Sequence, residues 1–310
     1  AGFNYVLLPL RITPNYFNGN YNDWVGDNVE QDALLTEKSI NRWSETAIDF
    51  LIVDHYGLDI KWESYFVDKG FAVGIIDDLV NRRHSGAFLI DQTCGRENTE
   101  YYDLVPSSMR LFTGESYCIL RPEFLFYRPV SLMKRNNDSL SLRIMINFGS
   151  TDPHNFTARA LSGLKPFMGL YKGKVVAVVG SGCPHIATIK KVISKLPYQC
   201  ELLIDVEYMA KLMVDVDLAI GAAGVTTWER CILGIPTLLL KTAENQSDVI
   251  HRVVEKGAAR IYSGAPDDPA LSASLVDVLL AQQQISKAAS QLVDGKGMDE
   301  IISFMSFGAR

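Results

Sequence analysis

Short apolar runs alternate with stretches of helical spacing along most of the chain. Parallel strands that are buried on both faces read as continuous apolar runs, and the connections between them need helical crossovers. A helix is expected over residues 31–47. The predicted strands cover residues 3–10, 50–53, 71–76 and 87–90 in the first half, and 142–148, 175–179, 201–204, 218–220 and 237–240 in the second. The pattern therefore predicts an α/β fold built on parallel sheets.

A polar, charge-dense stretch at residues 130–141 separates the two series of strands, and we interpret it as a linker. It predicts two Rossmann-like domains, residues 1–130 and 142–310, with a cleft between them. In open parallel sheets, ligands bind at the carboxyl edge of the strands.

The stretch from Gly221 to Glu229 (GAAGVTTWE) carries the most information. It follows a predicted strand and opens a helix that should end before Gly234. Glycines and the first N–H groups of a helix favour phosphate oxygens, whereas the carboxylate of Glu229 suits a pair of ribose hydroxyls. This chemistry indicates a nucleotide. A closely packed strand-turn-helix unit without a ligand remains the alternative.

Residues 149–153 follow another predicted strand and should lie at the same carboxyl edge of the sheet. Asp152 can cap the following helix and Pro153 suits its first position, so neither residue needs a ligand to explain it. Gly149, Ser150 and Thr151 are better ligand candidates because they offer N–H and hydroxyl groups.

Acidic and aromatic residues follow the strands of the first half. Asp54, His55 and Tyr56 place an acid, an imidazole and a phenol at one strand end, where they could position a water or polarise a sugar hydroxyl. For His55 alone, a histidine that only bonds a backbone carbonyl is the favoured interpretation. The pair Asp77 and Asp78 is explained by helix capping as well as by metal binding, and we assign no metal.

Composition narrows the function classes. The 310 residues carry a net charge of -6, with an isoelectric point near 5.4, which argues against a surface for nucleic acid or anionic membranes. No run approaches the ~18 apolar residues of a membrane helix, and no signal peptide opens the chain. We therefore expect a cytoplasmic protein with a small-molecule substrate.

Several motifs, taken in order, resemble the UDP-2,4-diacetamido-2,4,6-trideoxy-beta-L-altropyranose hydrolases of pseudaminic acid biosynthesis. The motifs are DHYG at 54–57, IDDL at 76–79, LVP at 104–106, Gly114 with YCILRPEF at 117–124, FGSTD at 148–152, GAAG at 221–224, WERC at 228–231, and NQ at 245–246.

This resemblance implies a GT-B type fold, akin to the peptidoglycan glycosyltransferase that handles UDP-N-acetylglucosamine. It implies an enzyme that uses water, without metal or cofactor, to cleave the anomeric carbon–oxygen bond and release UDP. UDP would lie on the second domain and the sugar in the cleft. The residues carried over are Tyr56 and Asn245 at the reacting sugar, Gly149, Ser150 and Thr151 near phosphates or sugar, Gly224, Val225, Thr226, Thr227 and Glu229 at the nucleotide, and Gln246 at the substrate.

The sequence departs from the family at its start. Family members open with a strand and a Gly-x-Gly-His turn whose histidine is the expected general base, whereas residues 3–10 resemble their second strand and none of the five histidines lies in such a turn. We expect that a segment is omitted here. Val225 also replaces a serine, and Ser150 a glycine. A GT-B glycosyltransferase and a catalytically silent nucleotide-sugar-binding homologue therefore remain alternatives.

Overall fold

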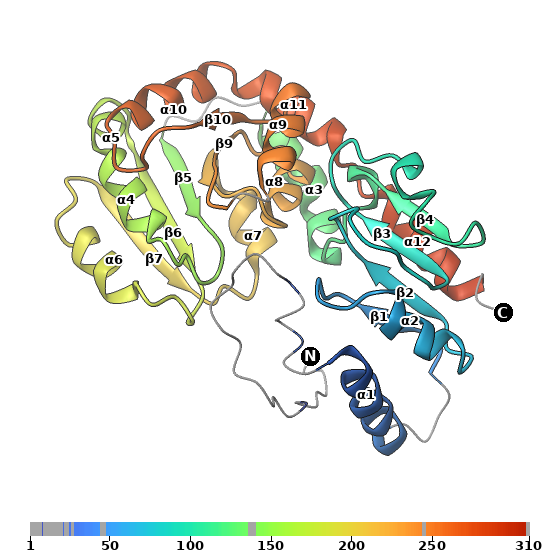
Figure 1. Cartoon of the computed structure of the whole chain (residues 1–310). Coiled ribbons are helices and arrows are strands. Elements are labelled where there is room, and N and C mark those ends of the chain that lie inside the picture. The colour runs from blue at the N-terminus through green and yellow to red at the C-terminus, as the bar shows by residue number, and fades with distance from the viewer. Residues whose placement is uncertain are drawn as a thin grey trace. The chain divides into compact units, whose positions relative to one another are not determined.

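The computed structural model describes residues 8, 21, 25, 28–43, 48–135, 141–243 and 246–307. The chain divides into two compact units, the first from residues 1–117 with 296–310 and the second from residues 118–295 (Figure 1).

The first unit contains a parallel sheet in the order β1-β2-β3-β4, whose register joins Ile75 to Leu89 and Leu89 to Leu111. Its core is buried aliphatic and aromatic side chains such as Val73 and Phe66. The strands are β1 (Leu51–Val53), β2 (Val73–Ile76), β3 (Phe88–Asp91) and β4 (Arg110–Thr113), the helices are α1 (Val29–Trp43), α2 (Ile60–Val67) and α12 (Lys296–Phe307), and two 3₁₀ turns are η2 (Asn98–Tyr101) and η3 (Glu115–Tyr117).

The second unit contains a six-stranded parallel sheet in the order β10-β9-β8-β5-β6-β7. Side chains alternate along β5, so that Ile144 and Ile146 face a core shared with α4 and α10, while Met145 between them is also fully buried. Its strands are β5 (Leu142–Asn147), β6 (Gly173–Val179), β7 (Gln199–Ile204), β8 (Leu218–Gly221), β9 (Thr237–Leu240) and β10 (Arg260–Tyr262). Its helices are α3 (Pro122–Lys134), α4 (Phe156–Gly163), α5 (Lys165–Leu170), α6 (Ile186–Ile193), α7 (Met209–Val214), α8 (Thr226–Ile232), α9 (Ser247–Glu255), α10 (Ala270–Leu280) and α11 (Gln282–Leu292).

The α/β prediction with two parallel sheets is confirmed, and every predicted strand after residue 48 is present. The predicted strand at residues 3–10 lies outside the described residues, apart from Leu8. Strands β4 and β10 were not predicted. Both are short edge strands with partly exposed side chains, so neither produces a continuous apolar run.

The units differ from the expected ranges at two places. Helix α12 belongs to the first unit, where Phe304 packs 5.7 Å from the ring centroids of both Phe88 and Phe112 and Glu300 accepts a hydrogen bond from Tyr117. Helix α3 belongs to the second unit and extends to Lys134, into the stretch that we interpreted as a linker.

Hydrogen bonds to helix ends explain why α3 joins the second unit. Arg128 donates to the carbonyls of Ile232 (2.6 Å), Val293 (3.0 Å) and Ser290 (2.7 Å), near the ends of α8 and α11. Carbonyls at a helix end lack partners within the helix, so a guanidinium satisfies them well. Ser131, inside the stretch that we interpreted as a linker, likewise donates to the Leu233 carbonyl at 2.7 Å. A polar residue that indicated a linker is therefore a packing group.

Candidate functional site

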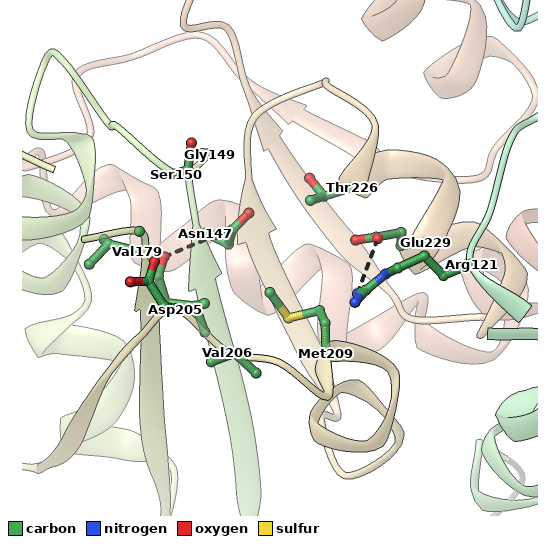
Figure 2. Close-up of a pocket in the computed structure, with 12 residues that line it drawn as sticks. Arg121, Asn147, Gly149, Ser150, Val179, Asp205, Val206, Met209, Thr226 and Glu229 are labelled. Atoms are coloured by element: carbon green, nitrogen blue, oxygen red, sulfur yellow. Dashed lines mark hydrogen bonds and ion pairs between the residues drawn. The ribbon is translucent and has the colours of Figure 1, made fainter. Parts of the chain in front are cut away.

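The candidate site is a pocket of about 290 Å³ in the second unit, at the point where the strand order reverses. From β5 the chain proceeds to β6 and β7 on one side, while β8, β9 and β10 lie on the other. Asn147 pairs with Gly221 at the carboxyl ends of β5 and β8. Such a switch point is where open parallel sheets bind ligands. The lining residues are Arg121, Asn147, Gly149, Ser150, Val178, Val179, Gly180, Asp205, Val206, Met209, Thr226 and Glu229 (Figure 2).

Three neighbouring strand ends are bound to one another along one side of the pocket. The N–H of Gly180, after β6, donates to the carbonyl of Ser150, after β5, at 2.8 Å. A Cβ on Gly180 would lie 2.9 Å from the Cβ of Ser150, so this approach requires glycine. Asp205, after β7, has a left-handed φ of 52° and accepts the N–H of Ser181 at 2.8 Å. These bonds fix the pocket wall.

Two of the three ligand candidates predicted after β5 line the pocket. These are Gly149 and Ser150, whereas Thr151 is exposed and does not line the pocket. Gly149 has a φ of 90°, and nothing lies within 4 Å of where its Cβ would be, so a ligand could approach its backbone closely.

Asp152 caps α4 as expected, because its two carboxylate oxygens accept the N–H groups of Phe156 (2.8 Å) and Thr157 (2.9 Å). Pro153, however, is not the first helical residue. It lies in a turn, and α4 begins at Phe156.

The turn from β8 into α8 brings Thr226 and Glu229 to the pocket, and α8 ends before Gly234 as predicted. Gly224 and Val225 are exposed and do not line the pocket. Thr227 is buried, and its hydroxyl bonds the Ala222 carbonyl (3.5 Å) while it accepts from Arg230 (3.1 Å). Its side chain therefore serves the turn itself.

Glu229 is a largely buried carboxylate with a basic neighbour. Burial raises its pKa, and the positive charge of Arg121, 3.8 Å away from guanidinium nitrogen to carboxylate oxygen, opposes that shift. Arg121 also pairs with Glu123 at 2.9 Å and donates to the Glu207 carbonyl at 3.2 Å. Figure 2 shows Arg121 and Glu229 pointing toward each other. A carboxylate so placed can accept hydrogen bonds from two hydroxyls.

Arg121 was missed as a site residue by the sequence analysis, although it stands in a quoted motif. It is the one basic residue among the described residues that line the pocket. It comes from the start of α3, far along the chain from Glu229, and only the packing of α3 against α8 brings the two together. No sequence spacing signals such a pair.

Asn147 is a buried amide in the pocket lining, 4% exposed. Its Nδ2 donates to the Val178 carbonyl at 3.0 Å, which fixes the amide orientation. Its Oδ1 has no hydrogen-bond partner among the described residues.

Tyr56 lies in the first unit, near the carboxyl ends of its strands. Burial raises the pKa of its phenol, and the charge of Asp78, together with a hydrogen bond to it, raises the pKa further. Tyr56 therefore stays protonated and can act as a hydrogen-bond partner, not as a base. His55 accepts the Gly57 N–H at 3.0 Å through Nδ1, and burial lowers its pKa.

The first unit also contains a buried charge cluster that sequence reasoning did not identify. His84 is 2.7 Å from Glu63 and 3.5 Å from Asp77, and Asp77 is 2.7 Å from Arg82. The buried phenol of Tyr101 donates to Asp91 at 2.9 Å. The cluster explains Asp77 as an ion-pair partner.

Two further expected residues are not in the pocket as described. Asn245 lies outside the described residues. Gln246 does not line the pocket, and its Oε1 accepts from the Thr242 N–H (3.1 Å) and hydroxyl (3.0 Å). Within the described ranges, no group of three or more His, Cys, Asp or Glu side chains could hold a metal ion. None of the described helices is long and apolar enough to span a membrane.

Comparison with curated proteins confirms the resemblance seen in the motifs. The chain is 26% identical over 220 residues to UDP-2,4-diacetamido-2,4,6-trideoxy-beta-L-altropyranose hydrolase of Campylobacter jejuni, across 70% of this chain and 75% of that protein. It is 25% identical over 206 residues to spore coat polysaccharide biosynthesis protein SpsG of Bacillus subtilis, across 65% of this chain but only 59% of the relative. No protein-family model matches the chain.

Comparison with solved structures confirms the GT-B type fold. MurG of Acinetobacter baumannii superposes with a TM-score of 0.62 at 14% identity, over 90% of this chain and 78% of MurG. UDP-GlcNAc 2-epimerase of Neisseria meningitidis, solved with UDP-GlcNAc, gives a TM-score of 0.61 at 14% identity, over 94% of this chain and 84% of the epimerase.

Proposed function

We propose that the protein is a UDP-sugar hydrolase that cleaves the anomeric carbon–oxygen bond of a UDP-linked diacetamido-trideoxy sugar and releases UDP. The observation that carries the proposal is the switch-point pocket, whose lining unites a buried carboxylate, two hydroxyls and one arginine. The relation to the Campylobacter hydrolase supports the choice of substrate and reaction.

In this proposal the nucleotide occupies the pocket of the second unit. The pocket volume is close to the lower end of the range for small-molecule binding sites. Glu229 accepts hydrogen bonds from the ribose hydroxyls. Ser150, Thr226 and the open backbone at Gly149 lie near the diphosphate, where Arg121 can pair with a phosphate once it leaves Glu229.

The reaction joins a water oxygen to the anomeric carbon while the bond from that carbon to the bridging oxygen breaks. UDP leaves with the bridging oxygen and its electron pair, and the proton that the attacking water loses passes to solvent. Tyr56 is proposed to hold the sugar or the attacking water, since its phenol oxygen can accept a hydrogen bond while its O–H donates to Asp78. Asn245 is proposed as the partner of the sugar from the other half of the chain.

The GT-B fold itself also suits a glycosyltransferase, and the similarity to spinosyn rhamnosyltransferase SpnG, with a TM-score of 0.53 over 88% of this chain, keeps that function as a second candidate. The two differ in one requirement, because a transferase needs an acceptor and a hydrolase does not. A silent nucleotide-sugar-binding protein would need neither and would release nothing.

The direct test incubates the protein with the UDP-linked sugar and no acceptor, and follows UDP and free sugar by chromatography. We expect both products in equal amounts. Binding of the substrate without any product would contradict hydrolysis, and product formation only after an acceptor is added would identify a transferase. A Glu229→Gln variant that binds less UDP and also forms the products more slowly would tie product formation to this pocket.

A further inference from the structure

Arg230 is a fully buried cation next to the pocket that the proposed reaction leaves unexplained. The residue is 1% exposed and follows Glu229 in α8. Burial lowers the pKa of its guanidinium to about 10, against the opposing effects of Cys231 and Glu229, so it keeps its charge at neutral pH. Among the described residues, the carboxylate whose charge acts on it is that of Glu229, the preceding residue.

The hydrogen bonds of Arg230 all go to the turn that borders the pocket. Its Nη2 donates to the Ala222 carbonyl at 2.7 Å and the Thr227 hydroxyl at 3.1 Å, and its Nη1 reaches the hydroxyl of Thr226, a pocket-lining residue, at 3.4 Å. Its Nε has no hydrogen-bond partner among the described residues. These neutral acceptors therefore satisfy only some of the five N–H groups of the guanidinium.

The sequence makes room for this guanidinium at the end of β8. A Cβ on Gly221 would lie 2.5 Å from Nη1 of Arg230 and 2.4 Å from the Asn147 carbonyl oxygen. Glycine at this position lets the charge lie directly against the strand end that faces the pocket.

Stability alone gives a poor account of such a group. Moving a charge out of water costs several kcal/mol, and hydrogen bonds to neutral carbonyls and hydroxyls recover only part of that cost. An apolar side chain of the same volume would avoid the cost. A bound anion in the adjacent pocket would instead supply the opposite charge across a medium that screens poorly.

We propose that Arg230 is a positioning residue for a diphosphate. It holds the turn at residues 222–227 through Ala222, Thr226 and Thr227, and its buried charge favours the dianionic part of the ligand without touching it. The inference rests on the proposed function, because it assumes that a nucleoside diphosphate occupies the pocket. If so, Arg230, which does not line the pocket, accounts for most of the preference for UDP over uridine.

The test compares the affinities of UDP and uridine by calorimetry in three variants. Arg230→Lys keeps the charge, Arg230→Gln keeps hydrogen bonding without charge, and Arg230→Met keeps neither. We expect the ratio of UDP to uridine affinity to fall roughly tenfold or more in the Gln and Met variants and to stay within about threefold in the Lys variant. Equal losses for both ligands in the neutral variants would show that Arg230 is a purely structural clamp and would overturn the proposal.

A measurement on the unaltered protein covers the case in which the neutral variants do not fold. With ¹⁵N-arginine, the Nε–H signal that is missing from the Arg230→Lys spectrum identifies Arg230. UDP should shift that signal and uridine should not, whereas equal shifts would overturn the inference. If the unaltered protein binds no UDP at all, the proposed function fails; if it binds UDP while Arg230 does not respond to charge, only this inference fails.

Discussion

Glu229 carries the main argument at the residue scale, because its position combines burial with a nearby guanidinium. A buried carboxylate is costly unless it is paired, and the 3.8 Å separation from Arg121 is a loose pairing. A ligand with two hydroxyls would satisfy the remaining acceptor sites. This is the physical basis for placing the ribose there.

The first prediction concerns this carboxylate. Glu229→Gln should weaken UDP binding by about 1.5 to 3 kcal/mol, since it removes charge-assisted hydrogen bonds to the ribose. Calorimetry with UDP measures the change. Glu123→Gln is the matched control, because Glu123 pairs with the same arginine but does not line the pocket; an equal effect of both substitutions would move the role from Glu229 to Arg121.

The pH dependence of UDP binding gives a second prediction. Because burial raises the pKa of Glu229, the carboxylate should protonate at a higher pH than an exposed glutamate. UDP affinity should therefore decline on acidification earlier in the unaltered protein than in Glu229→Gln. Parallel pH profiles of the two proteins would contradict the role of the ionised form.

Tyr56 gives the third prediction at this scale. Tyr56→Phe should lower the turnover number, while UDP affinity stays within about threefold, because the phenol serves the sugar and not the nucleotide. Tyr102→Phe, at an exposed tyrosine of the same unit, is the control. A large loss of UDP affinity in Tyr56→Phe would show that the phenol belongs to the nucleotide site.

The buried cluster around His84 matters at the scale of elements, because it links α2 to the loops after β2. Burial alone would lower the pKa of His84, but Asp77 and Glu63 raise it to about 9. Asp77 in turn has a lowered pKa: burial opposes that shift, while His84 and Arg82 cause it. A histidine whose pKa is raised by folding stabilises the folded state fully at pH values below its unfolded pKa, which is near 6.5. This stabilisation is lost as the pH rises through the folded pKa of about 9.

We therefore predict that the free energy of unfolding declines between pH 6.5 and 9.5 by on the order of 3 kcal/mol from this group. Urea denaturation of the unaltered protein at both pH values measures the decline. In His84→Gln this decline should disappear, and in His251→Gln, at an exposed histidine of α9, it should persist. A decline that survives in His84→Gln would contradict the charged cluster.

At the same scale, the strands were predictable and parts of the site were not. Central strands such as β5 and β8 are buried on both faces and read as apolar runs, whereas the edge strand β4 contains Arg110 and reads as a loop. Gly149, Ser150, Thr226 and Glu229 follow predicted strands, so their convergence on one edge could be foreseen. The roles of Arg121 and α3 depend on contacts distant in sequence, which no local pattern encodes.

At the scale of the whole molecule, the protein combines a GT-B type fold with a pocket contained in one compact unit. Solved proteins of this fold include a rhamnosyltransferase and a UDP-GlcNAc 2-epimerase, so the fold does not decide the reaction. The proposed function therefore rests on a claim about chemistry: in it, water attacks the anomeric carbon and UDP leaves intact.

Hydrolysis in ¹⁸O-labelled water, without an acceptor and with mass analysis of UDP, tests that claim most directly. UDP is the informative product, because the anomeric hydroxyl of a free sugar exchanges its oxygen with water whereas a phosphate oxygen does not under these conditions. We predict free sugar together with UDP that contains no ¹⁸O. UDP that carries ¹⁸O in its terminal phosphate would show attack at phosphorus and contradict hydrolysis at the anomeric carbon.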